Sequence, residues 1–305
     1  MTTRSNTGKV QSKNCACCTS TNLRHEPTLT SLFLSRAAWN GSPEFTNLIY
    51  CNDCGFRTYQ RALTEPEARN YYSNYRDDFY IKERCRDEIF YTKAAYDKDE
   101  EWMMSPRRQQ ELLAIVKDAN LSLHNLRILD FGGGDGRLIN NITAKELAVF
   151  DYANISPLPG IKKIPPPDPC SWDFVVCAQT LEHISNPINA LSHIKSITTE
   201  NGFIYIELPV QDWRSLAGDG PLRDKILEIS MKNRTFHKLA DLYSTAFRVK
   251  FGILPPYGFV PMREHVNFFS LKSIVSLGEN LSLKTIAARI NSFSGIQVIF
   301  KKTQI

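Results

Sequence analysis

The 305-residue sequence has no apolar run of the ~18 residues that a membrane-spanning helix needs. Its first residues also lack the apolar core of a signal peptide, so we expect a cytoplasmic protein with no membrane partner. Charge of one sign is not in large excess, because the net charge of +5 is small for this length and is spread along the chain. Charge therefore gives no indication of a nucleic-acid partner.

Glycine is scarce, with 15 residues in the whole chain, yet four of them lie together between Asp130 and Gly136. The preceding segment 127–131 is apolar and β-prone, as a buried strand should be, and a short helix is expected from Leu138. A glycine-rich turn between a strand and a helix brings backbone N–H groups against a bound ligand. This turn is therefore the first candidate ligand site.

Strand and helix patterns alternate after residue 127, which is typical of a parallel sheet with helices on both faces. Further strands are expected at 148–151, 173–177 and 202–209, and a helix at 187–197. Ligands of such sheets bind outside the carboxyl ends of the strands. The candidate cofactor-binding residues lie at those ends or in the loops that follow them, and they are Asp130, Gly132, Gly134, Asp135, Gly136, Asp151, Gln179 and Glu182.

Two carboxylates narrow the choice of cofactor. Asp151 ends the second strand, where a carboxylate can accept hydrogen bonds from both ribose hydroxyls of an adenosine. A dinucleotide is disfavoured, because the glycine spacing is not GxGxxG and because Asp135 would lie beside a pyrophosphate. A cationic ligand with an amino group would accept that carboxylate, so we expect S-adenosylmethionine.

Four stretches carry a family resemblance: "ILDFGGGDGRL", "VFDYAN", "WDFVVCAQTLEHISNPINAL" and "GFIYIELP". They resemble the successive motifs of class I S-adenosylmethionine-dependent methyltransferases. The resemblance implies that the glycine loop receives the methionine part of the cofactor, that Asp151 holds the ribose, and that residues 179–183 border cofactor and acceptor. The proline-rich stretch 156–171 departs from the family, and since proline cannot build a normal helix we expect a shortened wall or a loop there.

Five of the eight cysteines gather near the start of the chain. Cys15-x-x-Cys18 is followed after 32 residues by Cys51-x-x-Cys54, which is the spacing of a tetrahedral Zn²⁺ site made by two tight turns. Cys17 is not expected to be a ligand, because its spacing is poorer. A structural zinc is the favoured interpretation, and four free buried thiols are the alternative.

These patterns predict an α/β fold with a doubly wound, mostly parallel, seven-stranded sheet, a small N-terminal zinc-binding domain and a helical insertion. The expected units are a zinc-binding module at 1–62, a tyrosine-rich helical segment at 63–104, and a methyltransferase domain at 105–305 with an insertion at 210–261. The tyrosines either pack the small domain against the large one or belong to a lid whose hydroxyls face a polar ligand. The insertion is expected to cover the carboxyl ends of the strands and shape the acceptor site.

The zinc module, the tyrosines and the stretch from Arg263 together resemble bacterial methyltransferases that act on nucleotide-linked sugars. That resemblance implies that His265 is a base that removes a proton, with Glu264 as its companion. Met262 stands where the C-methylating members have tyrosine, so C- and O-methylation are both left open. His265 could instead be a hydrogen-bonded residue before the helix from Ser270, and His183 either steers the acceptor or holds its loop.

Two other classes of function are weighed against a sugar methyltransferase. One is a methyltransferase that modifies a nucleic acid or protein docked on the zinc module, although residues 1–60 lack the interleaved basic and aromatic residues of nucleic-acid readers. The other is a protein that binds the cofactor without catalysis.

Overall fold

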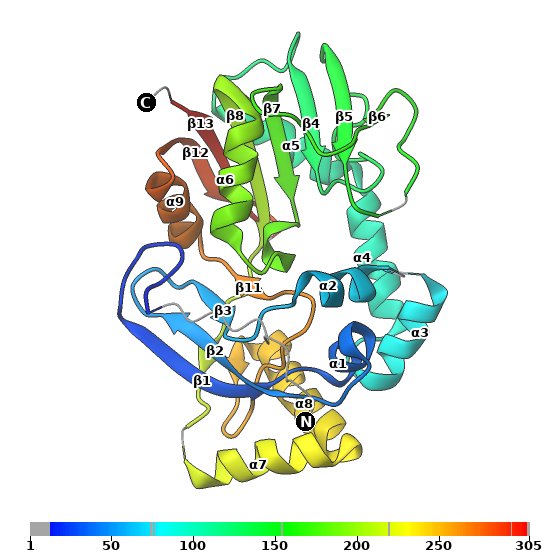
Figure 1. Cartoon of the computed structure of the whole chain (residues 1–305), viewed down its shortest axis with the longest axis vertical. Coiled ribbons are helices and arrows are strands. Elements are labelled where there is room, and N and C mark those ends of the chain that lie inside the picture. The colour runs from blue at the N-terminus through cyan, green and yellow to red at the C-terminus, as the bar shows by residue number, and fades with distance from the viewer. Residues whose placement is uncertain are drawn as a thin grey trace, which may run out of the picture.

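The computed structural model describes residues 13–73, 75, 77–153, 155–218, 220–293 and 295–303. The first 12 residues of the predicted zinc-binding module thus lie outside the described residues. The chain forms two lobes, one around a large sheet and one around a small sheet (Figure 1). Within the described ranges, no helix combines the length and the apolar character that crossing a bilayer requires.

The large-sheet lobe contains a seven-stranded sheet in the order β12-β13-β8-β7-β4-β5-β6. The five strands from β4 to β8 run parallel to their neighbours, whereas β13 pairs antiparallel with β8 and β12 antiparallel with β13. This arrangement confirms the predicted doubly wound, mostly parallel sheet. The strands are β4 (Arg127–Phe131), β5 (Glu146–Phe150), β6 (Lys162–Lys163), β7 (Trp172–Ala178), β8 (Thr198–Pro209), β12 (Leu283–Ile290) and β13 (Gly295–Lys302).

Helices cover both faces of the large sheet. Successive residues of a strand point to opposite faces, so neighbouring residues pack against different helices. Leu129 of β4 packs on the face covered by α6 (Pro187–Ile197) and α9 (Leu271–Asn280). Its neighbour Ile128 packs on the opposite face, which α5 (Pro106–Asp118) covers. The apolar run of β4 therefore belongs to a strand buried on both sides.

The prediction of a short helix from Leu138 is wrong. Residues 137–141 form turns, and no helix joins β4 to β5. The carbonyls of Leu138 and Asn140 accept hydrogen bonds from the amide nitrogen of Gln109, at 3.0 and 2.6 Å. A side chain of α5 thus takes the place of the backbone donors that a helix would supply. The predicted absence of a normal helix in 156–171 is confirmed, since that stretch contains loops and the two-residue strand β6.

The small-sheet lobe is built from both ends of the chain. Its sheet has the order β1-β2-β3-β11 and is antiparallel throughout. The last strand comes from the far end of the sequence, with Asn267 opposite Thr58. The strands are β1 (Leu23–Leu29), β2 (Phe45–Cys51), β3 (Arg57–Tyr59) and β11 (Asn267–Phe268).

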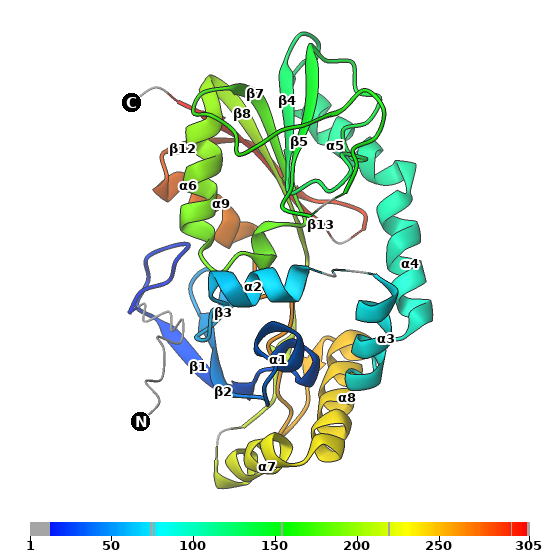
Figure 2. The same ribbon diagram turned by 45° about the vertical axis from the view of Figure 1, so that its right-hand side comes forward.

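The helical part of this lobe includes the predicted insertion. Its two long helices, α7 (Pro221–Lys232) and α8 (Arg234–Phe251), pack against each other, and Leu227 of α7 shares a buried cluster with Leu29 of β1. The α4 helix (Lys93–Met104) runs along one side of the molecule between the lobes (Figure 2). The remaining elements are α1 (Leu32–Trp39), α2 (Glu65–Tyr72), α3 (Asp78–Asp87), α4 (Lys93–Met104), β9 (Arg214–Ser215), α7 (Pro221–Lys232), α8 (Arg234–Phe251) and β10 (Ile253–Leu254).

Two sequence signals for helices are confirmed in this region. Thr64 and Glu67 form the capping box that starts α2, and Ser105 caps α5 through the N–H of Arg107. The insertion is helical as expected, but its helices pack against the small-sheet lobe. The domain boundaries themselves stay a prediction.

Candidate functional site

The glycine loop lies at the carboxyl end of β4, where three of its residues need a left-handed backbone. Gly132, Gly134 and Gly136 have φ of +77°, +61° and +80°, a region that other residues rarely adopt. Gly133 is restricted in another way, because a Cβ there would lie 2.1 Å from Cγ of Asp130. No side chain at these positions therefore stands between the loop and a ligand. The N–H groups of the three left-handed glycines themselves donate within the protein, to the carbonyls of Phe150 and Gly133 and to the carboxylate of Asp151.

A buried network of charged groups supports this loop. Asp130 is 1% exposed, and burial raises its pKa to about 7, although the nearby Arg108 of α5 opposes the shift. The Nε of Arg108 donates to Oε1 of Glu207 on β8 at 2.9 Å. Asp130 is thus poised between its neutral and charged forms directly beneath the glycines.

Asp151 follows β5 and contacts the same loop. Its two carboxylate oxygens accept hydrogen bonds from the N–H groups of Gly134 and Ala153, at 2.8 and 2.7 Å. A carboxylate offers about four lone-pair positions, so it can accept two further donors. The prediction that Asp151 lies at the tip of the second strand, next to the glycine loop, is confirmed in its placement.

The negative charge of Asp135 is compensated by a neighbouring arginine. Arg137 forms a bidentate ion pair with it, with two nitrogen–oxygen distances of 2.9 Å. Burial opposes ionisation of this carboxyl, but Arg137 outweighs burial and lowers its pKa. The charge of Asp135, which was expected to be free for a cationic ligand, is therefore paired with Arg137.

The loop after β7 touches the glycine loop. Gln179 has φ of +54° and donates its N–H to the carbonyl of Glu207 at 2.8 Å. Thr180 lies so close that a Cβ on Gly132 would meet its Cγ2 at 2.7 Å. The short 3-10 helix η1 (Leu181–His183) follows directly. Residues 179–183 are therefore brought to the expected edge of the sheet.

Two half-buried histidines meet at this edge. The rings of His183 and His265 have their centroids 4.7 Å apart, at an interplanar angle of 78°. The Nδ1 of His265 lies 2.9 Å from the amide oxygen of Gln211, and the Nδ1 of His183 lies 3.1 Å from the carbonyl of Glu264. Since a carbonyl oxygen only accepts, both Nδ1 atoms carry a proton. Burial, with a contribution from His183, lowers the pKa of His265 to about 3, so this ring is neutral at pH 7.

Glu182 completes this group. It is 1% exposed, and neither carboxyl oxygen has a hydrogen-bond partner among the described residues. Burial raises its pKa to about 8. Glu182, His183 and His265 each offer one ligand atom, and these atoms lie within 4.8 Å of one another. Two imidazoles and a carboxyl can transfer protons, and they also form a donor set that divalent transition metals accept.

Glu264 faces away from this pair of rings toward α3. Arg84 donates to both of its carboxylate oxygens, at 2.5 and 2.9 Å, and the hydroxyl of Tyr80 donates at 3.1 Å. Burial opposes ionisation, but Arg84 holds the pKa of Glu264 far below its usual range. The residue hydrogen-bonded to the ring of His265 is thus Gln211, and Glu264 is bound to Arg84.

The tyrosines pack the lobe together, as one of the two predicted alternatives has it, and the lid stays a prediction. Tyr71 and Tyr80 are buried, their hydroxyls are 2.8 Å apart, and their rings pack against Phe33 of α1. Tyr72 instead brings its hydroxyl to 3.3 Å from Nδ1 of His183. Aromatic packing thus joins α2 and α3 to the lobe, while one hydroxyl reaches the histidine pair.

The four-cysteine cluster is confirmed in its grouping. The sulfur atoms of Cys15 and Cys54 are 3.5 Å apart, as are those of Cys18 and Cys51, and all four lie within 4.8 Å. Zn–S bonds of ~2.3 Å in a tetrahedron place sulfur atoms ~3.8 Å apart, so the cluster fits zinc. Cys17 is buried outside the group, as expected from its spacing.

Three residues of the site were missed by the sequence analysis. Arg108 lies on the apolar stripe of α5 with Leu112 and Ile115, and a charge on such a stripe is a usable signal for a buried partner. Arg84 follows Tyr80 by one helical turn and could have been found in the same way. Gln211 has no local pattern that sets it apart.

The sequence of the chain matches a known protein family. Residues 104–288 match a family described as a methyltransferase domain. The match spans more than half of the chain, which therefore belongs to this family. With its sheet order and glycine loop, the protein is a class I S-adenosylmethionine-dependent methyltransferase, an enzyme of EC class 2.1.1, and its methyl acceptor is not identified by the match. No curated protein matches the chain.

Solved methyltransferase structures resemble the chain at low sequence identity. One from Thermotoga maritima has 13% identity and a TM-score of 0.41, with 68% of this chain and 96% of that chain covered. One from Aquifex aeolicus has 13% identity and a TM-score of 0.39, with 68% and 98% covered. One from Mesorhizobium loti has 10% identity and a TM-score of 0.39, with 61% and 95% covered.

Proposed function

We propose that the enzyme methylates a small molecule, namely a sugar or a nucleotide-linked sugar, at carbon or oxygen. The observation that supports this proposal is the pair of rings of His183 and His265 at the same edge of the sheet as the glycine loop, of which the His265 ring is neutral at pH 7. Thr180 links the two parts, because it contacts Gly132 and lies three residues before His183. A group that can accept a proton thus lies at the same edge of the sheet as the proposed cofactor site.

The cofactor proposal rests on the fit of the loop. S-adenosylmethionine supplies a methyl group on a sulfonium, which is a good leaving group. We propose that Gly132, Gly134 and Gly136 take its methionine part, that Asp151 accepts the ribose hydroxyls, and that Asp130 supports the loop from below. Asp135, Gln179 and Glu182 then border the cofactor.

His265 is the proposed base. Nε2 of His265 would receive the proton that the acceptor loses when it takes the methyl group. Gln211 keeps Nδ1 protonated and so keeps the lone pair on Nε2. His183 would steer the acceptor, and Glu264 would position the segment by its ion pair with Arg84. Such catalysis consists mainly of orientation and desolvation, with a proton transfer added.

We propose a structural Zn²⁺ at Cys15, Cys18, Cys51 and Cys54. Four thiolates saturate a tetrahedral ion and leave no position for substrate. The site also lies against α9, where Ser270 donates to the carbonyl of Cys54 and Asn280 to that of Cys17. Its role is therefore to hold two turns on the large-sheet lobe.

The test is an acceptor screen with S-adenosylmethionine labelled on the methyl group. The panel contains free sugars, nucleotide sugars, nucleic acid and unfolded protein. We expect label in the sugar or nucleotide-sugar fraction. Label found only in nucleic acid or protein would overturn the proposal and favour an acceptor docked on the zinc module.

A matched pair of variants tests the base. His265→Gln should lower the methyl-transfer rate by about 10²–10⁴-fold, the usual contribution of general base catalysis, with cofactor binding unchanged in calorimetry. His124→Gln, which changes an exposed histidine, is the control and should keep the full rate. Equal rates for the two variants would contradict the role of His265.

A further inference from the structure

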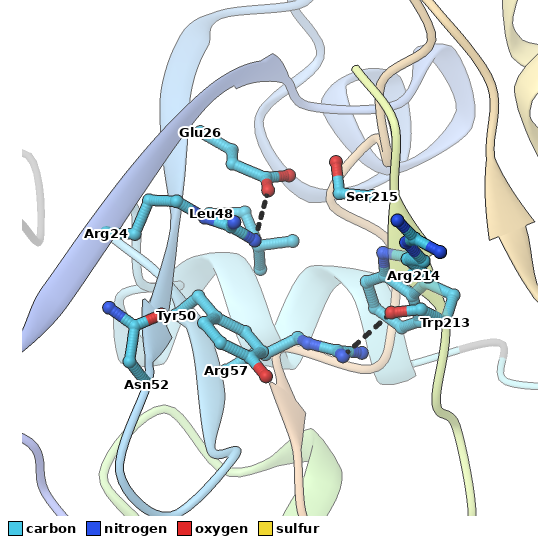
Figure 3. Close-up of a pocket in the computed structure, with 9 residues that line it drawn as sticks. All are labelled: Arg24, Glu26, Leu48, Tyr50, Asn52, Arg57, Trp213, Arg214 and Ser215. Atoms are coloured by element: carbon cyan, nitrogen blue, oxygen red, sulfur yellow. Dashed lines mark hydrogen bonds and ion pairs between the residues drawn. The ribbon is translucent and has the colours of Figure 1, made fainter. Parts of the chain in front are cut away.

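A cavity of about 320 Å³ opens in the small-sheet lobe, outside the glycine loop (Figure 3). This volume is at the lower end of the ~300–1,000 Å³ that small-molecule sites occupy. Strands β1, β2 and β3 form one wall, and β9 forms the other. The lining residues are Arg24, Glu26, Leu48, Tyr50, Asn52, Arg57, Trp213, Arg214 and Ser215.

The lining is positively charged. It contains three arginines and one glutamate, which is a net charge of +2. The guanidinium carbons of Arg24 and Arg57 lie 5.0 and 4.8 Å from the centre of the same Tyr50 ring. Glu26 pairs with Arg24 at 2.8 Å and so balances only one of these charges inside the cavity. Positive charges that line one cavity repel each other, and an anion bound between them would offset that repulsion.

Arg57 is held rigidly in the cavity wall. Its side chain is 6% exposed, and its guanidinium carbon lies 3.9 Å from the centre of the Trp213 ring. One guanidinium nitrogen donates to the carbonyl of Trp213 at 3.0 Å and to Asp212 at 2.7 Å. Asp212 itself is 83% exposed, so water screens much of its charge. Because the side chain of Arg57 is already fixed, it would lose little conformational entropy when an anion binds.

Two donors at the other wall lack partners. The hydroxyl of Ser215 is buried and has no hydrogen-bond partner among the described residues. Figure 3 shows Ser215 and Glu26 facing each other across the cavity, with Arg214 beside Ser215. The side chain of Arg214 is exposed and has neither a hydrogen bond nor an ion pair within the described part of the chain. An unmade hydrogen bond of a buried hydroxyl is costly, and a ligand acceptor would remove that cost.

We propose that this cavity binds the phosphate groups of a diphosphate-bearing molecule. A diphosphate diester carries two ionised oxygens, which match the net charge of the lining. Arginine donates to phosphate in a bidentate manner, and Ser215 supplies a further donor. The faces of Tyr50 and Trp213 are already occupied by guanidinium groups, so the recognition concerns phosphate and not a stacked base.

The cavity is connected to the histidine pair through one segment. Trp213 lines the cavity, and Gln211, two residues earlier, is bound to His265. Two residues span at most ~7 Å, so a ligand held by its phosphates can extend toward the histidines. That this ligand is the methyl acceptor rests on the proposed function, whereas the binding of diphosphate does not.

Calorimetry with the full chain at low salt tests the proposal. The probes are inorganic pyrophosphate, a nucleoside diphosphate and a nucleoside diphosphate sugar. We expect Arg214→Met to weaken binding by about 10-fold or more, since hydrogen bonds to charged groups have that size. Ser215→Ala should also weaken binding while the melting temperature stays equal or rises, because a hydroxyl without a partner is removed. Lys225→Met removes one exposed charge from α7 and is the control that should bind as the parent does.

The probes distinguish the sources of phosphate. Equal affinity for pyrophosphate and the nucleotides supports a site for phosphate alone, and tighter binding of the nucleotide sugar supports the acceptor assignment. No binding by any probe, or equal loss in Arg214→Met and Lys225→Met, overturns the cavity proposal. If binding is confirmed but the labelled acceptor carries no phosphate, the link to methyl transfer fails and the binding site stands.

Discussion

Asp151 couples the strand tip to the glycine loop, and this residue gives the simplest test of the cofactor site. Asp151→Asn keeps the size of the side chain and removes its charge. Since hydrogen bonds to charged groups contribute about 1.5–3 kcal/mol, we expect S-adenosylmethionine to bind about 10–100-fold more weakly. Titration calorimetry measures this affinity, with the exposed Asp224→Asn as control. Unchanged affinity in Asp151→Asn would place the ribose elsewhere.

Glu182 predicts a pH dependence of stability. Its pKa is raised from the ordinary 4.5 to about 8 by burial, so between these values the folded state binds the proton more tightly than the unfolded state does. The free energy of unfolding therefore falls as pH rises through that window. Glu182→Gln removes this contribution, and its stability should fall less steeply between pH 5 and 8. Urea unfolding at each pH measures the two slopes, and parallel curves would contradict the shifted pKa.

At the residue scale, the site residues that belong to a short sequence motif could be predicted. The glycines, Asp151 and the four thiols are placed as their spacing indicated. Gln211 could not be found, because its partner His265 is 54 residues away and no pattern joins them. The pairing of Glu264 with Arg84, 180 residues apart, is equally invisible in the sequence.

At the scale of elements, α3 is tied to the site by one ion pair. Arg84→Met leaves the buried carboxylate of Glu264 without its cation, whereas Glu88 keeps Arg263 at 3.2 Å. An uncompensated buried charge costs about 3–5 kcal/mol, so the free energy of unfolding should fall by about that amount in urea titrations.

The double variant Arg84→Met/Glu264→Gln provides the control for this prediction. It removes both charges, so no unpaired carboxylate remains, and it should recover a large part of the lost stability. If the double variant is as unstable as Arg84→Met alone, lost packing and not the unpaired charge of Glu264 is the cause.

Helices that have a capping residue and a periodic apolar pattern could be predicted from the sequence. The connection between β4 and β5, which has neither, could not. Thr64 and Ser105 marked the starts of α2 and α5 correctly. The helix expected after Leu138 fails because Gln109, on another element, binds the carbonyls of that turn. Tertiary hydrogen bonds of this kind override local propensity, and they have no trace in the segment itself.

At the scale of the whole molecule, the cysteine cluster should decide overall stability. Its sulfurs belong to the same buried cluster as α6 and α9, so loss of metal loosens the large-sheet lobe too. Elemental analysis should find one zinc per chain, and Cys51→Ser should lose it. For a chain of this size each kcal/mol lost lowers the melting temperature by about 2 °C. The exposed Cys170→Ser is the control, and equal zinc content in both variants would contradict the site.

The parallel arrangement of the large sheet was predictable from the alternating pattern, but the composition of the small-sheet lobe was not. Its core joins Leu48 and Tyr59 to Trp213, Leu254 and Met262, which come from the insertion and its flank. Contacts of such sequence separation are set by the packing of the complete chain. The zinc module was therefore predicted as a unit by its cysteines, whereas its shared core could be seen only in three dimensions.

The pairing of β3 with β11 has a consequence for the order of events during protein synthesis. Thr58 leaves the ribosome 209 residues before Asn267, its neighbour across the two strands. At translation rates of ~5–20 residues per second, this interval lasts about 10–40 s. Throughout that time the edge of β3 is without its partner strand, so an early-synthesised sheet waits for the last part of the chain. Chaperone dependence of the nascent chain should accordingly end only when residue 268 has emerged.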